Sequence, residues 1–314
     1  MPDYSKTRRD SPASRTNNRV IALLTVPLMM LAAAARAVEA MAAPPVRTMR
    51  PHLFLTAEKL PGLRSVAELR AAIRQPGHTA ELWKLLLTQA DRDTSAPVIT
   101  PTNFQIPERS DAQRTTANPD YYVCRAAGQR ILRNALAYLI TENPRYRDVA
   151  LRQIETLLDS TEWPDWRDRA HREYPADLRS GALGRDIGIA YDWLHGSLSP
   201  AERRSIVEGL DRRAIQPFWQ SVDAGTWWVN GHNNWTTCIV GGLGIVGMAL
   251  AEDHPDGGRL VDFSQSRMRD YLQHYGKQGE FNESVGYSAA TRLPAVYFDA
   301  LRYHTRGGEN VLGR

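Results

Sequence analysis

The chain has 314 residues, of which 42% are hydrophobic and 24% charged, and its formal net charge is +4. This composition is typical of a globular protein and excludes a disordered chain, a collagen and a membrane protein with several spans. Residues 1–43 hold six Lys/Arg and three acidic residues, which leaves a net charge of +1 for the remainder. Bulk charge therefore gives no argument for a nucleic-acid partner, and we expect none.

The first 43 residues have the pattern of an export signal. A basic stretch precedes the apolar run Val20–Ala35, and small-residue sites follow at 35–37 and 40–42. This order predicts a signal peptide over residues 1–43. The alternative is an uncleaved membrane anchor, but the run contains Pro27 and is short for a membrane span. We therefore expect a periplasmic or secreted protein without membrane association after cleavage, and the sequence leaves its oligomeric state open.

The next predicted region, residues 44–118, combines an N-terminal helical segment with a long loop. Thr56 followed by Glu58 predicts the start of a helix-like stretch. Residues 94–118 are rich in Pro, Thr and Asn, and this composition predicts a loop.

From Pro119 onward the apolar residues recur with a helical period. The face from Ile131 to Leu139 predicts a helix that Asn143-Pro144 ends. Ser199-Pro200-Ala201-Glu202 is a capping box with Pro at the first helical position, which predicts a helix start. The helices after the first are expected near residues 149–158, 178–195, 200–221, 232–252, 260–275 and 288–303.

Short connections between these helices predict antiparallel hairpins packed side by side. Almost no segment alternates with period two, so the expected fold is all-α. We predict an incomplete α/α toroid over residues 119–314, truncated at its C-terminal end.

One motif suggests a nucleotide site, but its context does not. Residues 242–247 match G-x-G-x-x-G, yet no strand pattern precedes them and no βαβ pattern occurs elsewhere. We interpret these glycines as positions where a buried helix packs closely. Patterns such as H-E-x-x-H, C-x-x-C and G-x-S-x-G are absent from the sequence, so we expect neither a cofactor nor a metal. Whether Cys124 and Cys238 pair is left open, with buried thiols favoured.

Residues 219–238 form the first candidate site segment. Four Trp fall within 17 residues, beside three Asn and one His, between the end of one predicted helix and the start of the next. Flat Trp faces stack on sugar rings, and Asn side chains together with helix N-terminal amides bind carboxylates. The structural alternative is that Asn233 or Asn234 caps the helix and the Trp side chains pack in the core. The candidate residues are Trp227, Trp228, His232, Asn233, Asn234 and Trp235.

A second candidate segment, residues 276–292, is a Gly-rich turn that leads into a helix. Loops at the same end of alternate helices meet at one mouth of a toroid, so Tyr287 is expected to face the first segment. Glu283 is interpreted either as orienting a partner or as a solvated, helix-capping acid. Arg292 lies one turn after Tyr287 and is interpreted as binding a substrate carboxylate or as a surface residue.

Four motifs follow one another along the chain. They are His52-Leu53-Phe54-Leu55-Thr56, Tyr191-Asp192-Trp193-Leu194 with the capping box after it, Asn233-Asn234-Trp235 with Gly241-Gly242, and Glu283-Ser284-Val285-Gly286-Tyr287. Together they resemble the helical domain of heparinase II/III-type polysaccharide lyases, which include oligoalginate lyases, over about residues 50–306. The resemblance implies a toroid followed by an antiparallel β-sandwich domain, which we expect to be missing here. In the family that domain can supply a further catalytic His and a structural metal site.

The resemblance also implies a chemistry. A uronate lyase removes the proton at C5, beside the carboxylate, and expels the oxygen at C4. Donors must first neutralise the carboxylate, and the resemblance assigns this role to His232, Asn233 and Asn234 without choosing between the asparagines. Tyr287 is the candidate acid and, for elimination on one face, also the base, while His232 is the other candidate base.

The predicted substrate is an acidic polysaccharide or oligosaccharide, alginate-like or heparin-like. Its predicted binding residues are Trp227, Trp228, Trp235, Glu283 and Arg292.

Two other classes stay open. A toroidal glycoside hydrolase would use two carboxylates, and no spacing singles out a pair among Asp186, Asp192, Glu280 and Glu283. The third class is a non-catalytic glycan-binding protein or a truncated lyase remnant. A conjugated double bond in the product identifies a lyase, and binding without turnover identifies the third class.

Overall fold

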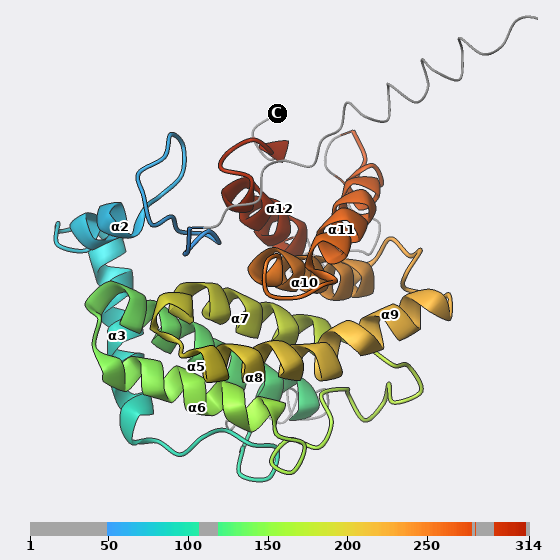
Figure 1. Ribbon diagram of the computed structural model, residues 1–314, viewed down its shortest axis with the longest axis horizontal. Helices are drawn as coiled ribbons and strands as arrows, with labels where there is room; N and C mark the ends of the chain where they lie inside the picture. Colours follow the sequence, from blue (N-terminus) through green and yellow to red (C-terminus); the bar gives the residue numbers. More distant parts are fainter. Residues whose placement is uncertain (1–48, 107–118, 278–279, 281–291, 312–314) are drawn as a thin grey trace, which may run out of the picture. The chain divides into compact units, whose positions relative to one another are not determined.

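The computed structural model describes residues 49–106, 119–277, 280 and 292–311. The chain divides into two units, Met1–Ala43 and Pro44–Arg314, and the predicted signal peptide lies outside the described residues. Within the described part of the second unit every regular element is a helix (Figure 1). This confirms the all-α prediction. None of the described helices is both long and apolar enough to cross a membrane.

Some consecutive helices are joined by short connections, at residues 142–143, 195–199 and 251–256, whereas residues 159–177 form a longer one (Figure 1). In chain order the elements are α2 (Val66–Ala72), α3 (His78–Ser95), α5 (Pro119–Thr141), α6 (Pro144–Leu158), α7 (Leu178–Leu194), η1 (His195–Ser197), α8 (Pro200–Leu210), η2 (Asp211–Ile215), α9 (Gln216–Asp223), α10 (Asn234–Leu250), α11 (Gly257–Leu272) and α12 (Arg292–His304).

Local sequence signals set several of these boundaries. Glu142 takes a left-handed backbone conformation with φ 60°, and Asn143 caps α6 by accepting a hydrogen bond from the N–H of Arg145. The predicted break at Asn143-Pro144 is therefore confirmed. The predicted capping box of α8 is also present, because the side chains of Ser199 and Glu202 each accept from the other's backbone N–H.

The helix predicted over 200–221 is interrupted by one π-helical turn, η2. Pro217 in α9 has no N–H to donate to the carbonyl of Arg213, and its ring would clash with that carbonyl in a regular helix. The turn before it widens, so that the N–H of Gln216 bonds to the carbonyl of Asp211. The helical path continues, but its register changes.

The helix-like start predicted at Thr56 is wrong. Thr56 instead bridges to Ser65, since its N–H donates to the carbonyl of Arg64 at 3.0 Å and its carbonyl accepts from Val66 at 2.9 Å. The helix begins ten residues later, where Ser65 and Glu68 form the capping box of α2.

The core is built around α7, which packs against α5 on one side and α10 on the other (Figure 1). A Cβ atom at Gly242 of α10 would lie 2.3 Å from the carbonyl oxygen of Gly181 in α7. Gly244 and Gly247 come equally close to Ser264 and Leu260 of α11. The glycines of residues 242–247 therefore let one buried helix approach two neighbours, which confirms the packing interpretation of this motif.

The N-terminal arm, residues 49–65 before α2, ties α7 to α10. Asp192 of α7 has no exposed side-chain surface, and its Oδ2 accepts the backbone N–H groups of His52 and Leu53 at 2.9 Å each. Arg50 donates to the carbonyl of Ala249 in α10 at 2.6 Å. The motif that begins at His52 therefore has a structural role, because it holds the arm against α7.

Candidate functional site

A cavity of about 540 Å³ lies between α5, α7 and the first residues of α10 and α12. Its walls follow helical periodicity, because side chains three or four residues apart share one helix face. Arg125, Gln129 and Leu132 come from α5, and α7 contributes a matching row, namely Leu178, Ala182, Arg185 and Ile189.

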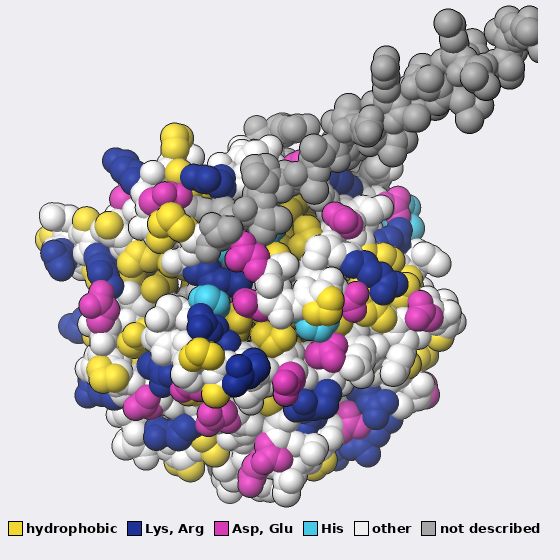
Figure 2. Space-filling model, viewed as in Figure 1, with side chains coloured by type: hydrophobic (Ala, Val, Ile, Leu, Met, Phe, Trp, Pro, Cys, Tyr) yellow, Lys and Arg dark blue, Asp and Glu magenta, His cyan; other side chains and the backbone are white. Residues whose placement is uncertain are grey.

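The cavity concentrates positive charge. Its described lining residues include four arginines, Arg125, Arg179, Arg185 and Arg292, but one carboxylate, that of Asp186. On the face shown in Figure 2, basic and acidic side chains are interspersed. This local excess of arginine favours an anionic ligand.

Two of these arginines form ion pairs with carboxylates of the protein. Arg185 lies 2.8 Å from the buried carboxylate of Asp186, and Arg179 lies 3.4 Å from Asp168. Burial raises the pKa of the Asp186 carboxyl, an effect that Arg185 opposes. Arg125 and Arg292 are exposed and have no carboxylate partner among the described residues, so they remain available to a ligand.

Asn234 and Arg292, both predicted from the sequence, line this cavity together. Asn233 instead caps α10, with its Oδ1 accepting from the N–H groups of Trp235 and Thr236 at 3.0 and 3.4 Å. The side-chain amide of Asn234 makes no hydrogen bond within the described part of the chain. Asn233 therefore caps the helix, as the structural alternative predicts. The side-chain N–H groups of Asn234 remain available to a ligand.

His232 is not among the residues that line the cavity. Its Nε2 lies 2.9 Å from Oδ2 of Asp270 in α11, and its ring stacks on that of His274 with centroids 3.4 Å apart. The hydrogen bond from His232 holds the pKa of the Asp270 carboxyl below its ordinary value. Ligand atoms of these three side chains all lie within 4.8 Å of one another, a spacing that could hold a metal ion.

The three predicted sugar-binding tryptophans have different environments. Trp228 has no exposed surface and packs on Phe218, so it offers no face to a sugar and belongs to the core. Trp227 is 48% exposed, and its ring centroid lies 5.1 Å from that of half-buried Trp235.

Trp235 also contacts two aromatic side chains that the sequence analysis did not identify, those of His171 and Tyr174. They lie about sixty residues earlier in the chain, and no local pattern joins them to the Trp-rich segment.

Tyr287 and Glu283 lie outside the described residues. The expected approach of Tyr287 to His232 and Asn234 therefore stays a prediction.

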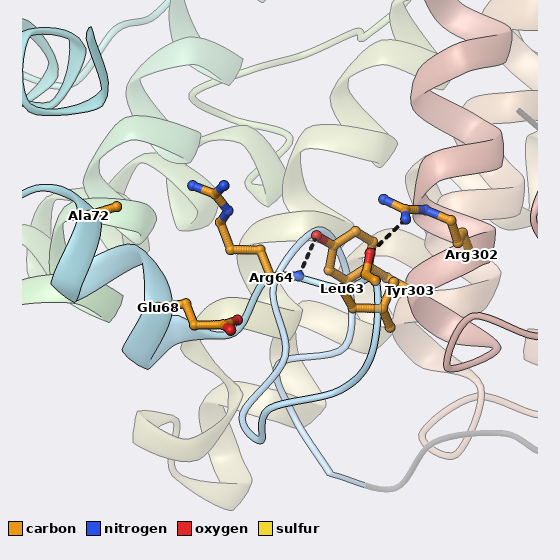
Figure 3. A pocket seen from close by; sticks show the side chains of 7 residues that line it. Leu63, Arg64, Glu68, Ala72, Arg302 and Tyr303 are labelled. Carbon is orange, nitrogen blue, oxygen red and sulfur yellow. Dashed lines mark hydrogen bonds between the residues drawn. The ribbon is translucent and has the colours of Figure 1, made fainter. Parts of the chain in front are cut away.

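A second cavity, of about 470 Å³, lies between the N-terminal arm and α12 (Figure 3). Figure 3 shows that its polar groups serve the fold, because the hydroxyl of Tyr303 accepts from the N–H of Arg64 at 3.0 Å. Arg302 donates to the carbonyl of Gly62 at 2.8 Å and pairs with Asp299. The arginine-lined cavity is thus the better candidate site.

No protein-family model matches the chain, and no curated protein matches it. Its structure is similar to a histidine-to-alanine variant of alginate lyase A1-III in complex with a tetrasaccharide. The TM-score is 0.54 at 14% sequence identity, and the match covers 82% of this chain and 72% of the other. At this identity the similarity shows the fold alone: the chain has an all-α toroid fold similar to that of this alginate lyase.

Proposed function

We propose that this protein is a heparinase II/III-type polysaccharide lyase that cleaves uronate-containing glycans by β-elimination. The observation that carries the proposal is the cavity in which Asn234 and Arg292 meet three further arginines. Such a site suits a substrate with a carboxylate on each sugar. The similarity in fold to an alginate lyase solved with a tetrasaccharide supports the same substrate class.

The reaction needs a base, an acid and a neutralised carboxylate. The base takes the C5 proton, the C4–C5 double bond forms, the C4–O bond breaks and the leaving oxygen receives a proton. Negative charge grows on the uronate carboxylate during this step, so preorganised donors lower the barrier. In the proposal Asn234 and Arg292 supply these donors, and Tyr287 is the acid and, for elimination on one face, also the base. The ordinary pKa of a tyrosine hydroxyl is about 10, so this role requires a neighbouring positive charge that lowers it. His232, the other base candidate, does not line the cavity and is hydrogen-bonded to Asp270 instead.

A glycoside hydrolase is less well supported. It would need two carboxylates flanking the scissile bond, and Asp186, paired with Arg185, is the one carboxylate among the described lining residues. Asp192 is fully buried and holds the N-terminal arm. The carboxylates that the structure describes therefore favour elimination over hydrolysis.

The test is the ultraviolet absorbance of the unsaturated uronate product, with alginate and glycosaminoglycan substrates. We expect activity on one polymer, and Asn234→Ala should lower kcat by about 100-fold or more, as loss of an oxyanion donor does. Tyr287→Phe should abolish the absorbance change. The matched control is Arg74→Ala, which removes an exposed arginine that is not among the cavity-lining residues and should leave the rate unchanged.

Other outcomes separate the alternatives. Saturable binding of an oligouronate without an absorbance change would identify a glycan-binding protein, while new reducing ends without that change would identify a hydrolase. The absence of both binding and turnover would overturn the proposal.

Export is part of the same proposal, because a polymeric substrate lies outside the cell. Fractionation of cells that make the full chain should find it in the periplasm or medium, shortened by about the predicted signal peptide.

A further inference from the structure

The side chains of His232, Asp270 and His274 form a cluster that the proposed elimination does not require as a unit. Asp270 and His274 lie four residues apart at the C-terminal end of α11, and His232 comes from the segment before α10. One ligand atom from each lies within 4.8 Å of the others. Two segments that are distant in sequence thus bring two imidazoles and a carboxylate to one point.

The backbone around the cluster is held in place. Arg267 donates to the carbonyl oxygens of Val229 and Gly231 at 2.9 and 3.2 Å, which fixes the segment that carries His232. The same guanidinium binds Oδ2 of Asp270. The cluster is therefore supported by a neighbouring side chain, as metal ligands commonly are.

The two rings are stacked, with centroids 3.4 Å apart and planes that differ by 21°. Binding of a shared ion requires that the two rings turn about their Cβ–Cγ bonds, so that a lone pair of each points at the ion. In the described part of the chain no hydrogen bond occupies Nε2 of His274 or Oδ1 of Asp270.

We propose that His232, Asp270 and His274 form a binding site for a divalent transition-metal ion of the zinc class. Two imidazole nitrogens with one carboxylate oxygen select Zn²⁺ and its neighbours over Mg²⁺ and Ca²⁺, which prefer all-oxygen sites. Three protein ligands leave a fourth position for water or a ligand oxygen. The bound ion would join the start of α10 to the end of α11.

The experiment uses the full chain without a histidine tag, dialysed against a chelator and titrated calorimetrically with Zn²⁺ alone. We expect one ion per chain, no measurable binding of Mg²⁺, and a visible absorption band of tetrahedral Co²⁺ when cobalt replaces zinc. His274→Ala changes an exposed side chain and should weaken zinc binding by at least about tenfold, and Asp270→Asn should do the same.

The matched control is His78→Ala, an exposed histidine at the start of α3, which should bind zinc like the parent protein. Absence of stoichiometric binding would overturn the proposal, as would binding that His274→Ala leaves unchanged. The measurement contains no glycan, so its outcome is independent of whether the protein is a lyase.

Discussion

At the start of α10 two neighbouring asparagines have different roles. The side-chain oxygen of Asn233 accepts hydrogen bonds from the first backbone N–H groups of the helix. Asn234, one residue later, lines the cavity. Identical side chains diverge because successive residues at a helix start point in different directions. Which asparagine is available to a ligand therefore depends on where the helix begins and not on residue type.

Removal of the cap should cost stability. Asn233→Ala leaves two N-terminal N–H groups of α10 without their acceptor, and we expect a loss of about 1 kcal/mol in the free energy of unfolding. Urea denaturation measures this loss. Asn230→Ala, at an exposed position in the same loop, should change the stability by less than about 0.5 kcal/mol. Equal effects of the two variants would contradict the capping role.

A buried histidine should make stability depend on pH. His304 is 3% exposed, and burial, with His52 and Arg50 nearby, lowers its pKa from 6.5 to about 3. As the pH falls below 6.5 the unfolded chain binds a proton that the folded chain does not, so stability falls between pH 6.5 and about pH 3.

Between about pH 7.5 and about pH 5 the parent protein should lose about 2 kcal/mol more than His304→Gln, at about 1.4 kcal/mol per pH unit. Urea unfolding of both proteins at the two pH values checks this. Parallel losses in the two proteins would rule out His304 as the source.

At the scale of elements, the central contact is between α7 and α10. Gly242→Ala would place a methyl group 2.3 Å from the backbone carbonyl of Gly181, and backbone cannot rotate away as a side chain can. We expect a loss of at least about 2 kcal/mol in the free energy of unfolding, measured in urea.

The matched control for that prediction is Gly258→Ala. Gly258 is exposed in α11, and an added Cβ meets nothing within 4 Å. This variant should be as stable as the parent protein or more stable, by up to about 1 kcal/mol, because alanine restricts the unfolded chain. If Gly242→Ala were equally harmless, the two helices would not approach as closely as described.

In the whole molecule, the N-terminal arm is joined to α7 by the carboxylate of Asp192 and to α10 by Arg50. Asp192→Asn removes the charge that holds Arg50 and weakens acceptance of the N–H groups of His52 and Leu53. Arg50 keeps its ion pair with Asp253 at 3.0 Å, so the expected loss of about 1–2 kcal/mol comes from the weakened acceptance of two buried backbone N–H groups.

Limited proteolysis should then cut the arm near residue 50 faster than in the parent protein. The control is Asp223→Asn at an exposed position near the end of α9, which should leave both stability and cleavage unchanged. An unaltered cleavage pattern in Asp192→Asn would show that other contacts hold the arm.

Local patterns in the sequence predict most helix boundaries and the all-α class. The break at Asn143-Pro144 and the cap at Ser199 depend on atoms within four residues of one another, so local patterns reveal them. The capping box of Ser65 and Glu68 was equally local. Its signal is present in the sequence, although the predicted helix-like start was Thr56, nine residues before Ser65.

Which side chains meet depends on how the helices pack against one another. Arg125 and Arg185 lie on different helices, and the cavity between them exists because α5 packs on α7. Trp228 became core, whereas Trp227 stayed exposed. His232 was brought to His274 across more than forty residues. Side-chain neighbours of this kind depend on packing between helices, which composition and periodicity do not encode, whereas helix starts and ends are set by hydrogen bonds to adjacent residues.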